Sequence, residues 1–270
     1  MLYLLSPAKR LDYEARLPAA TLRKATEPLF VDRAAELIAT MRTKSASQVA
    51  SLMDLSEPLA ALNVERYAAW QPQATAVNSR PALLAFDGDV YGGLQARTLK
   101  ATDLNWAQQH LVILSGLYGV LRPFDRLQPY RLEMGTALRT ARGADLYAYW
   151  GDLLAQHLDE RLAGDRQPVL VNLASIEYAR AALRPALQAR VIDCVFEDWK
   201  DDQFKIISFF AKRARGLMVR WAIDQRINTP GRLKGFAVDG YAFDKPAIAA
   251  AASSSTSAEI ELMPATSTTE

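Results

Sequence analysis

The hydrophobic pattern of the chain predicts a set of short, buried β-strands. Several apolar runs are bounded by polar or turn-forming residues and are too short for a typical helix of a globular protein. Such runs are typical of strands inside a sheet. They lie at residues 2–5, 82–86, 111–114, 168–173, 190–196 and 204–210.

Other segments show helical spacing. Residues 45–54 and 102–110 each begin near a serine or threonine that can cap a helix, and residues 146–163 repeat apolar side chains every three or four positions. Helices and strands are mixed along the chain without strict alternation. The pattern therefore predicts an α+β fold, or an irregular mixed α/β fold, with a largely buried central sheet and surrounding helices.

Composition divides the chain into two parts. Half of the 270 residues are hydrophobic and 23% are charged, which is enough to build a sizeable core. Residues 247–270 differ, because sixteen of these 24 residues are Ala, Ser or Thr and none is basic. We expect a single domain over residues 1–246, followed by a disordered tail over residues 247–270.

Several classes of protein are disfavoured by what the sequence lacks. Cys194 is the single cysteine and His110 and His157 are the only histidines, so neither an intramolecular disulfide nor a zinc site is expected. We expect no cofactor and no stoichiometric metal. The sequence has no signal peptide and no apolar span of 18 residues, which favours a cytoplasmic protein without a membrane partner.

Polar residues follow two of the predicted strands, where open sheets often collect ligand-binding groups. Lys9 lies just beyond the first strand and could meet a phosphate or a carboxylate. Asn172, Ser175, Glu177 and Tyr178 lie at the end of another strand and could form a pocket wall. An equally simple interpretation is that Ser175 only caps the helix that follows it.

A glycine-bracketed turn follows the strand at 111–114. Gly116 and Gly119 bracket a Leu-Tyr pair, and Arg122 lies just beyond them. This spacing resembles the turn of a helix-hairpin-helix element, whose backbone amides bind a DNA phosphate. The bracket is one residue longer than usual, however, and the apolar run before it favours a strand over a helix.

The most unbalanced charge lies near the end of the predicted domain. Residues 205–234 contain eight basic residues and one acidic residue. If residues 211–226 form a helix, Lys212, Arg213 and Arg215 lie opposite its apolar face, and Gly216 lies among them where another backbone could approach closely. This excess of positive charge favours nucleic-acid binding, although a charged face can also be merely solvated.

At these residues the sequence resembles the bacterial YaaA family of peroxide stress resistance proteins. The matching stretches occur in the same order over nearly all of residues 1–246. They are SPAK (6–9), WQP (70–72), GDVYGGLQA (88–96), AQQHLVILSGLYGVLRPFD (107–125), QPYRLEMG (128–135), ARGADLYAYWGD (141–152), VNLASIEY (171–178) and FKIISFFAKRARGLMVR (204–220).

The resemblance implies a protein of the hydrogen peroxide response that lowers unincorporated iron and so limits damage to DNA and proteins. It also implies DNA binding through a basic cleft in an unusual α/β fold with a helix-hairpin-helix element. We therefore expect a non-enzymatic protein that binds the phosphate backbone of double-stranded DNA with little sequence specificity. The expected contacts are Lys9, Gly116, Gly119, Arg122, Lys205, Lys212, Arg213, Arg215 and Gly216.

The alternative is an enzyme that acts on a nucleotide or a phosphorylated metabolite in a pocket at the strand ends. Lys9, Asn172, Ser175, Glu177 and Tyr178 would line that pocket. Direct iron binding is a third alternative, and no metal-binding motif in the sequence supports it. An elongated basic groove would favour a polymeric ligand, whereas an enclosed cavity would favour a small one.

Overall fold

Four of the predicted apolar runs form the centre of a seven-stranded mixed sheet, as β1, β5, β8 and β9. The computed structural model describes residues 1–17, 19–243 and 258–264. The strands follow the order β10-β9-β8-β1-β5-β6, and β13 pairs with β9 outside this path. The mixed α/β architecture around a central sheet is therefore confirmed. The strands of this sheet are β1 (Leu2–Leu5), β5 (Leu111–Ser115), β6 (Gly119–Leu121), β8 (Val169–Leu173), β9 (Arg190–Lys200), β10 (Gln203–Lys205) and β13 (Ala258–Pro264).

Three parallel pairings hold the middle of the sheet together. Strand β1 pairs with β5 on one side and with β8 on the other, and β8 pairs with β9. Every residue of β1 and β5 is buried, as expected for parallel strands that are covered on both faces. Because β1 and β8 run in the same direction, Leu5 and Leu173 end both strands side by side, at one edge of the sheet.

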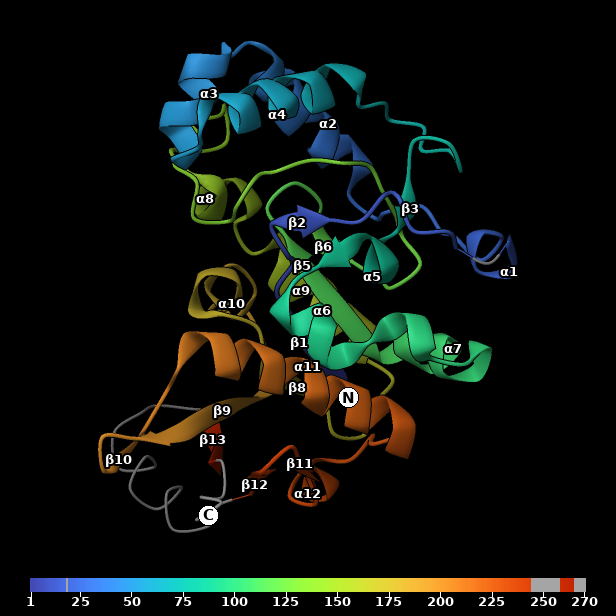
Figure 1. Cartoon of the computed structure of the whole chain (residues 1–270), viewed down its shortest axis with the longest axis vertical. Helices are drawn as coiled ribbons and strands as arrows, with labels where there is room; N and C mark the ends of the chain where they lie inside the picture. Colours follow the sequence, from blue (N-terminus) through green and yellow to red (C-terminus); the bar gives the residue numbers. More distant parts are fainter. Residues whose placement is uncertain (18, 244–257, 265–270) are drawn as a thin grey trace.

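Helices surround the sheet, and three of them gather at one end of the molecule, as Figure 1 shows for α2, α3 and α4. The longest helix, α11, lies across the lower part of that view, beside α6. The helices are α1 (Ala19–Leu22), α2 (Val31–Arg42), α3 (Ala46–Met53), α4 (Glu57–Ala69), α5 (Ala82–Ala85), α6 (Asp89–Leu94), α7 (Ala101–His110), α8 (Leu146–Trp150), α9 (Leu153–Leu162), α10 (Ile176–Ala182), α11 (Ser208–Gln225) and α12 (Pro230–Leu233), with a short 3₁₀ helix at Ala96–Thr98. Short two-stranded pairs complete the fold: β2 (Arg10–Leu11) with β4 (Phe86–Asp87), β3 (Arg80–Pro81) with β7 (Arg126–Leu127), and β11 (Ala237–Val238) with β12 (Tyr241–Ala242).

Three predicted elements differ in the structure. Residues 82–86 were expected to form a strand, but Ala82–Ala85 form a fully buried helical turn, since a short apolar run does not distinguish the two. The predicted strand at 204–210 ends at Lys205, and α11 begins at Ser208. The predicted helix at 146–163 is interrupted at Gly151, whose positive φ of 51° separates α8 from α9.

The expected helix-hairpin-helix element is not confirmed. Strands β5 and β6 form an antiparallel hairpin instead, and Ser115 pairs directly with Gly119 across the turn. The turn faces the interior, because Leu117 and Tyr118 are buried and a Cβ on Gly116 would overlap the carbonyl oxygen of Leu132. Both glycines are buried, so we do not retain Gly116 and Gly119 as phosphate contacts.

The predicted tail over 247–270 lies outside the described residues except for 258–264. These seven residues form β13, which runs parallel to β9 with Ala258 opposite Val191 and Pro264 opposite Glu197. At these positions the chain therefore extends the sheet beyond β9.

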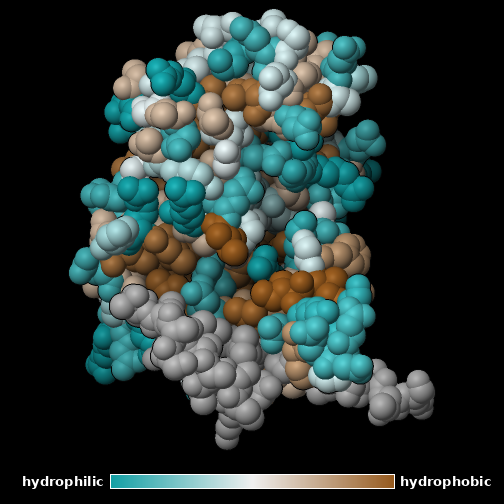
Figure 2. Space-filling view, turned by 90° about the vertical axis from the view of Figure 1, so that its left-hand side faces the viewer, coloured by the Kyte–Doolittle hydropathy of each residue, from teal (hydrophilic) through white to brown (hydrophobic). Residues whose placement is uncertain are grey.

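Exposed apolar side chains gather on the face that carries α10 and the start of α11. Figure 2 shows hydrophobic surface in the lower half of this face. The most exposed side chain of this group is Ile176 on α10, with 88% of its surface accessible, and Ile206, Phe209 and Phe210 lie at or just before the start of α11. This surface borders the edge of the sheet where β1 and β8 end.

Candidate functional site

A partly enclosed cavity of about 430 Å³ lies where β1 and β8 end. Segments from five parts of the chain line it, so the fold, and not one local motif, creates the site. The lining residues are Ser6, Pro7, Ala8, Lys9, Arg10, Asp87, Gly88, Asp89, Val90, Tyr91, Tyr130, Arg131, Leu132, Glu133, Ser175, Glu177, Tyr178, Lys212 and Arg215. We call this space the strand-end cavity.

Two serines join the floor of the strand-end cavity. The backbone N–H of Ser175 donates to Oγ of Ser6 over 2.8 Å, and the Ser6 hydroxyl donates to Oγ of Ser175 over 3.2 Å. Tyr91 of α6 donates its phenolic hydroxyl to the Ser6 carbonyl over 3.0 Å. Ser175 precedes α10, but its side chain makes no capping hydrogen bond. Its hydroxyl instead bonds to Ser6, just beyond the end of β1.

The basic side chains of the cavity differ in how they are paired. Lys9 forms an ion pair with Glu133, with Nζ 2.9 Å from Oε2, yet two-thirds of its side chain remains accessible. Lys212 of α11 is exposed and forms no ion pair with any described residue. Both cations therefore present charge to the mouth of the cavity.

Arg215 is the most unusual cation of the site. Burial lowers the pKa of its guanidinium, and its buried Nε has no hydrogen-bond partner among the described residues. A buried donor without a partner costs about 1–3 kcal/mol. An anionic or carbonyl oxygen bound beside Arg215 would remove this cost.

Two carboxylates, those of Glu133 and Glu177, also line the cavity. Glu133 also accepts from Arg131, with Nη2 2.9 Å from Oε1, so it is held between two cations. Glu177 accepts a hydrogen bond from the Gly135 backbone through Oε1 over 2.8 Å. The cavity lining contains five basic and four acidic side chains, so it is polar and mixed in charge, not uniformly basic.

Three tyrosines, Tyr91, Tyr130 and Tyr178, supply much of the wall of the cavity. All are buried, and burial raises the pKa of each phenol well above its ordinary value. They therefore stay protonated at neutral pH, and the single O–H of Tyr91 is already donated to the Ser6 carbonyl. Tyr130 already shares a hydrogen bond with Ser115, over 2.6 Å.

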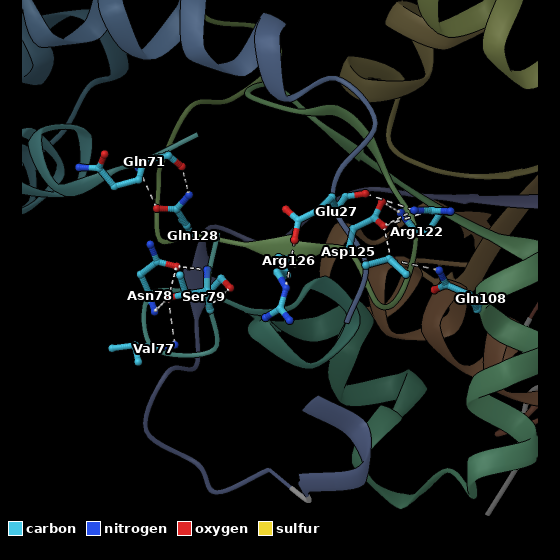
Figure 3. Close-up of polar contacts among 12 residues, drawn as sticks. Glu27, Gln71, Val77, Asn78, Ser79, Gln108, Arg122, Asp125, Arg126 and Gln128 are labelled. Carbon is cyan, nitrogen blue, oxygen red and sulfur yellow. Dashed lines mark hydrogen bonds and ion pairs between the residues drawn. The ribbon is translucent and has the colours of Figure 1, made fainter. Parts of the chain in front are cut away.

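The structure places most of the other predicted contacts elsewhere. Figure 3 shows Arg122 turned toward the buried carboxylate of Asp125, with Nη2 2.9 Å from Oδ1, and also toward the Glu27 carbonyl. Lys205 pairs with Asp201 over 3.1 Å, and Arg213 pairs with Asp239 over 3.3 Å. These three cations are partly neutralised and lie outside the strand-end cavity.

Gly216 and Asn172 differ from their predicted roles. Gly216 is buried between α11 and α6, where a Cβ would overlap the Val90 carbonyl oxygen, so no phosphate backbone reaches it. Asn172 donates to Asp193 over 2.6 Å and lines a second cavity of about 390 Å³, which Arg215 also lines. Of the predicted pocket wall, Ser175, Glu177 and Tyr178 do meet Lys9 in the strand-end cavity.

Several residues of the site were missed at the sequence level. Arg131 and Glu133 lie within the QPYRLEMG stretch, and Asp89 and Tyr91 lie within GDVYGGLQA, where residues 89–94 form α6. Both stretches were among those that matched the family, and this was the available signal. Nothing in their spacing indicated that they would meet SPAK.

Comparison with known proteins assigns the chain to a family. The family model described as "Peroxide stress protein YaaA" matches residues 1–247. The chain belongs to the YaaA family of peroxide stress proteins. Its relatives include a UPF0246 protein of Verminephrobacter eiseniae, 62% identical over 243 residues, which cover 90% of this chain and 93% of the relative. A UPF0246 protein of Paracidovorax citrulli is 58% identical over 249 residues, covering 92% of this chain and 95% of the relative.

Membership in the YaaA family indicates a role in the response to peroxide stress. In the described part of this YaaA-family chain, no three His, Cys, Asp or Glu side chains are grouped so that they could hold a metal ion. Nor does any helix of the described residues combine the length and apolar character needed to cross a bilayer.

Proposed function

We propose that this YaaA-family chain acts in the peroxide stress response as a cytoplasmic DNA-binding protein, without catalysis. In this proposal, Lys9, Lys212 and Arg215 contact the phosphate backbone of double-stranded DNA at the mouth of the strand-end cavity. The lowering of unincorporated iron implied by the family belongs to the same proposal, as an effect that needs no iron site in this chain.

One observation carries the proposal. Lys9 follows β1, whereas Lys212 and Arg215 lie on α11, some 200 positions later, and the fold brings all three to one cavity. Lys212 has no counterion and the buried Nε of Arg215 has no partner in the described residues. Cations that are not neutralised internally are the ones that gain most from a bound phosphate, because phosphate contacts release condensed counterions from DNA.

The position of these cations also limits specificity. Their contacts would be to phosphate oxygens, which fix the position of a protein on DNA but carry no sequence information. Duplexes of different sequence should therefore bind with similar affinity.

The salt dependence of duplex binding tests this proposal. The logarithm of the affinity should fall linearly with the logarithm of the salt concentration, with a slope of about 0.9 per phosphate contact. The double variant Lys212→Ala/Arg215→Ala should bind every duplex more weakly and with a shallower slope. The matched control is Lys205→Ala/Arg213→Ala, which removes two cations that are already paired. Equal slopes for the wild type and the first variant would reject this site.

The partly enclosed shape of the site supports a second candidate function. A cavity of about 430 Å³ lined by Lys9, Ser175, Glu177 and Tyr178 has the size and the few polar groups of a small-molecule site. This supports an enzyme that acts on a nucleotide or a phosphorylated metabolite. Turnover of a nucleotide panel by the purified protein, abolished by Lys212→Ala, would favour it over the non-catalytic proposal.

A further inference from the structure

The strand-end cavity is larger than phosphate contacts alone require. Its volume of about 430 Å³ falls within the range of pockets that bury most of a small ligand, which is roughly 300–1,000 Å³. A DNA backbone that lay across Lys9, Lys212 and Arg215 would leave the interior, with its tyrosine walls, unfilled. The tyrosine-lined interior therefore fits a ligand whose phosphate binds the three cations and whose remaining part extends into the cavity.

The cationic side of the cavity fits one phosphate group. Lys212 and Arg215 are three residues apart on α11, a spacing that places side chains on the same face of a helix. Lys212 has no counterion and the buried Nε of Arg215 has no partner in the described residues. Lys9 reaches the same cavity from the loop after β1.

The interior fits a planar, nitrogen-rich ring. The walls combine the rings of Tyr91, Tyr130 and Tyr178 with the apolar side chains of Val90 and Leu132. Aromatic walls stabilise bound nucleobases by stacking against the flat faces of the bases. An aliphatic phosphorylated metabolite would not use these rings.

The polar groups inside the cavity are rich in acceptors. Glu177 uses Oε1 for the Gly135 backbone, and no partner within the described residues accounts for its second oxygen. Glu133 is a second carboxylate of the lining, and it lies between the cations of Lys9 and Arg131. Carboxylate oxygens only accept hydrogen bonds, so they suit a ring that carries amino groups, as they do when they pair with the amino group of cytosine.

We propose that the strand-end cavity binds a single nucleotide unit, with its phosphate at Lys9, Lys212 and Arg215 and its base against the tyrosines. The unit is either a free mononucleotide or an unpaired nucleotide of DNA, and the second case rests on the DNA-binding function proposed above. An enzyme or binding protein that uses a base from duplex DNA must first take it out of the stack, which is easiest where the base is unpaired. Bases with amino groups are preferred over thymine.

The first arm of the test uses free mononucleotides. Calorimetric titration with dCMP, dAMP, dGMP and TMP should show binding, with dCMP at least severalfold tighter than TMP. Lys212→Ala should weaken dCMP binding by about tenfold or more, and Ala8→Leu, which fills the cavity from the loop after β1, should abolish it. Arg213→Ala is the matched control on the same helix, since its side chain pairs with Asp239 outside the cavity. Melting curves establish that each variant is folded. If Ala8→Leu does not fold, the test rests on Lys212→Ala, whose side chain is exposed.

The second arm compares a fully paired duplex with the same duplex carrying one bulged cytosine, by fluorescence anisotropy. A bulged duplex that binds about tenfold tighter, with the advantage lost in Ala8→Leu and kept in Arg213→Ala, identifies the unpaired nucleotide of DNA. Binding of dCMP without that advantage identifies the free mononucleotide. Equal affinities for the two duplexes, together with no mononucleotide binding at millimolar concentration, overturn the inference and leave the proposed DNA-binding function standing. Mononucleotide binding without any duplex binding would support the inference and overturn the proposed DNA-binding function.

Discussion

Gly216 of α11 lies against the backbone carbonyl of Val90 in α6, and a Cβ at position 216 would overlap that oxygen. Gly93 of α6 makes the reciprocal contact, since its own Cβ would overlap the carbonyl oxygen of Arg213. The two helices can therefore approach closely only because each presents a glycine. This contact fixes the distance between α11 and α6, and with it the position of Lys212 and Arg215 over the strand-end cavity.

Gly216→Ala should therefore destabilise the protein, although alanine is the better helix former. We expect the free energy of unfolding to fall by about 1–3 kcal/mol, as for other side chains forced into a packed core. Chemical denaturation measures this change. Gly92→Ala is the matched control in α6, because Gly92 is exposed and a Cβ there meets no atom within 4 Å. The control should be neutral or gain up to about 1 kcal/mol. Equal stability of the two variants would contradict the packing described here.

Arg122 is predicted to stabilise the fold and not to bind DNA. Its partner Asp125 is almost completely buried and also accepts from the Thr26 hydroxyl over 2.6 Å. Arg122→Ala would leave a buried carboxylate short of one donor, which should lower the free energy of unfolding by about 1–3 kcal/mol. Arg126→Ala, which breaks an ion pair with the exposed Glu27, should cost less than about 1 kcal/mol. Thermal melting separates the two variants.

Duplex binding measured below the melting temperature should be unchanged in Arg122→Ala. A variant that melts like the wild type but loses affinity for DNA would return Arg122 to the set of phosphate contacts.

The parts of the fold that could be predicted from the sequence are those that local patterns control. The strand at 2–5 matches β1, and the capping serine before α3 is Ser45, whose side chain accepts from the Gln48 backbone. The site was predicted only in part. Lys9, Ser175, Glu177 and Tyr178 could be found because polar residues at parallel strand ends converge on one edge of a sheet, and Lys212 and Arg215 because of the charge on α11.

The remainder depends on tertiary contacts that no local pattern encodes. The charge count along α11 treated its cations as equivalent, whereas Arg213 is paired with Asp239, and Arg215 has no such partner among the described residues. From the sequence, Gly216 was expected to leave space on a basic face for a DNA backbone. The structure shows that α6 occupies this space. Helical periodicity gives the face of a residue but not what lies opposite that face.

Acid should destabilise the protein partly through Glu36. Hydrogen bonds from Arg142, together with one from Tyr149, lower the pKa of its carboxyl from 4.5 to about 2. A depressed pKa in the folded state adds stability above pH 4.5, and that stability is lost as the pH falls from 4.5 toward 2. Melting temperatures across this range should therefore fall less steeply in Glu36→Gln. The control is Glu65→Gln, an exposed position on α4, which should keep the slope of the wild type.

The purified protein is predicted to hold far less than one iron per chain. Cys194 is the single cysteine and the two histidines are 47 positions apart, so the ligands that usually hold iron are scarce. Elemental analysis after aerobic and after anaerobic purification tests this expectation. One tightly held iron per chain in either preparation would show that a carboxylate site exists and that the protein lowers free iron directly.

The distance along the chain between the parts of the strand-end cavity has a consequence for biosynthesis. Lys9 leaves the ribosome early, whereas Lys212 and Arg215 follow only after α6 and β8 have been made, because α11 begins at Ser208. A nascent or prematurely terminated chain that ends before Ser208 carries Lys9 and the serine floor but lacks the unpaired cations. Such fragments cannot bind the ligand through Lys212 and Arg215, so the site is acquired only once α11 has been added to β1 and β8.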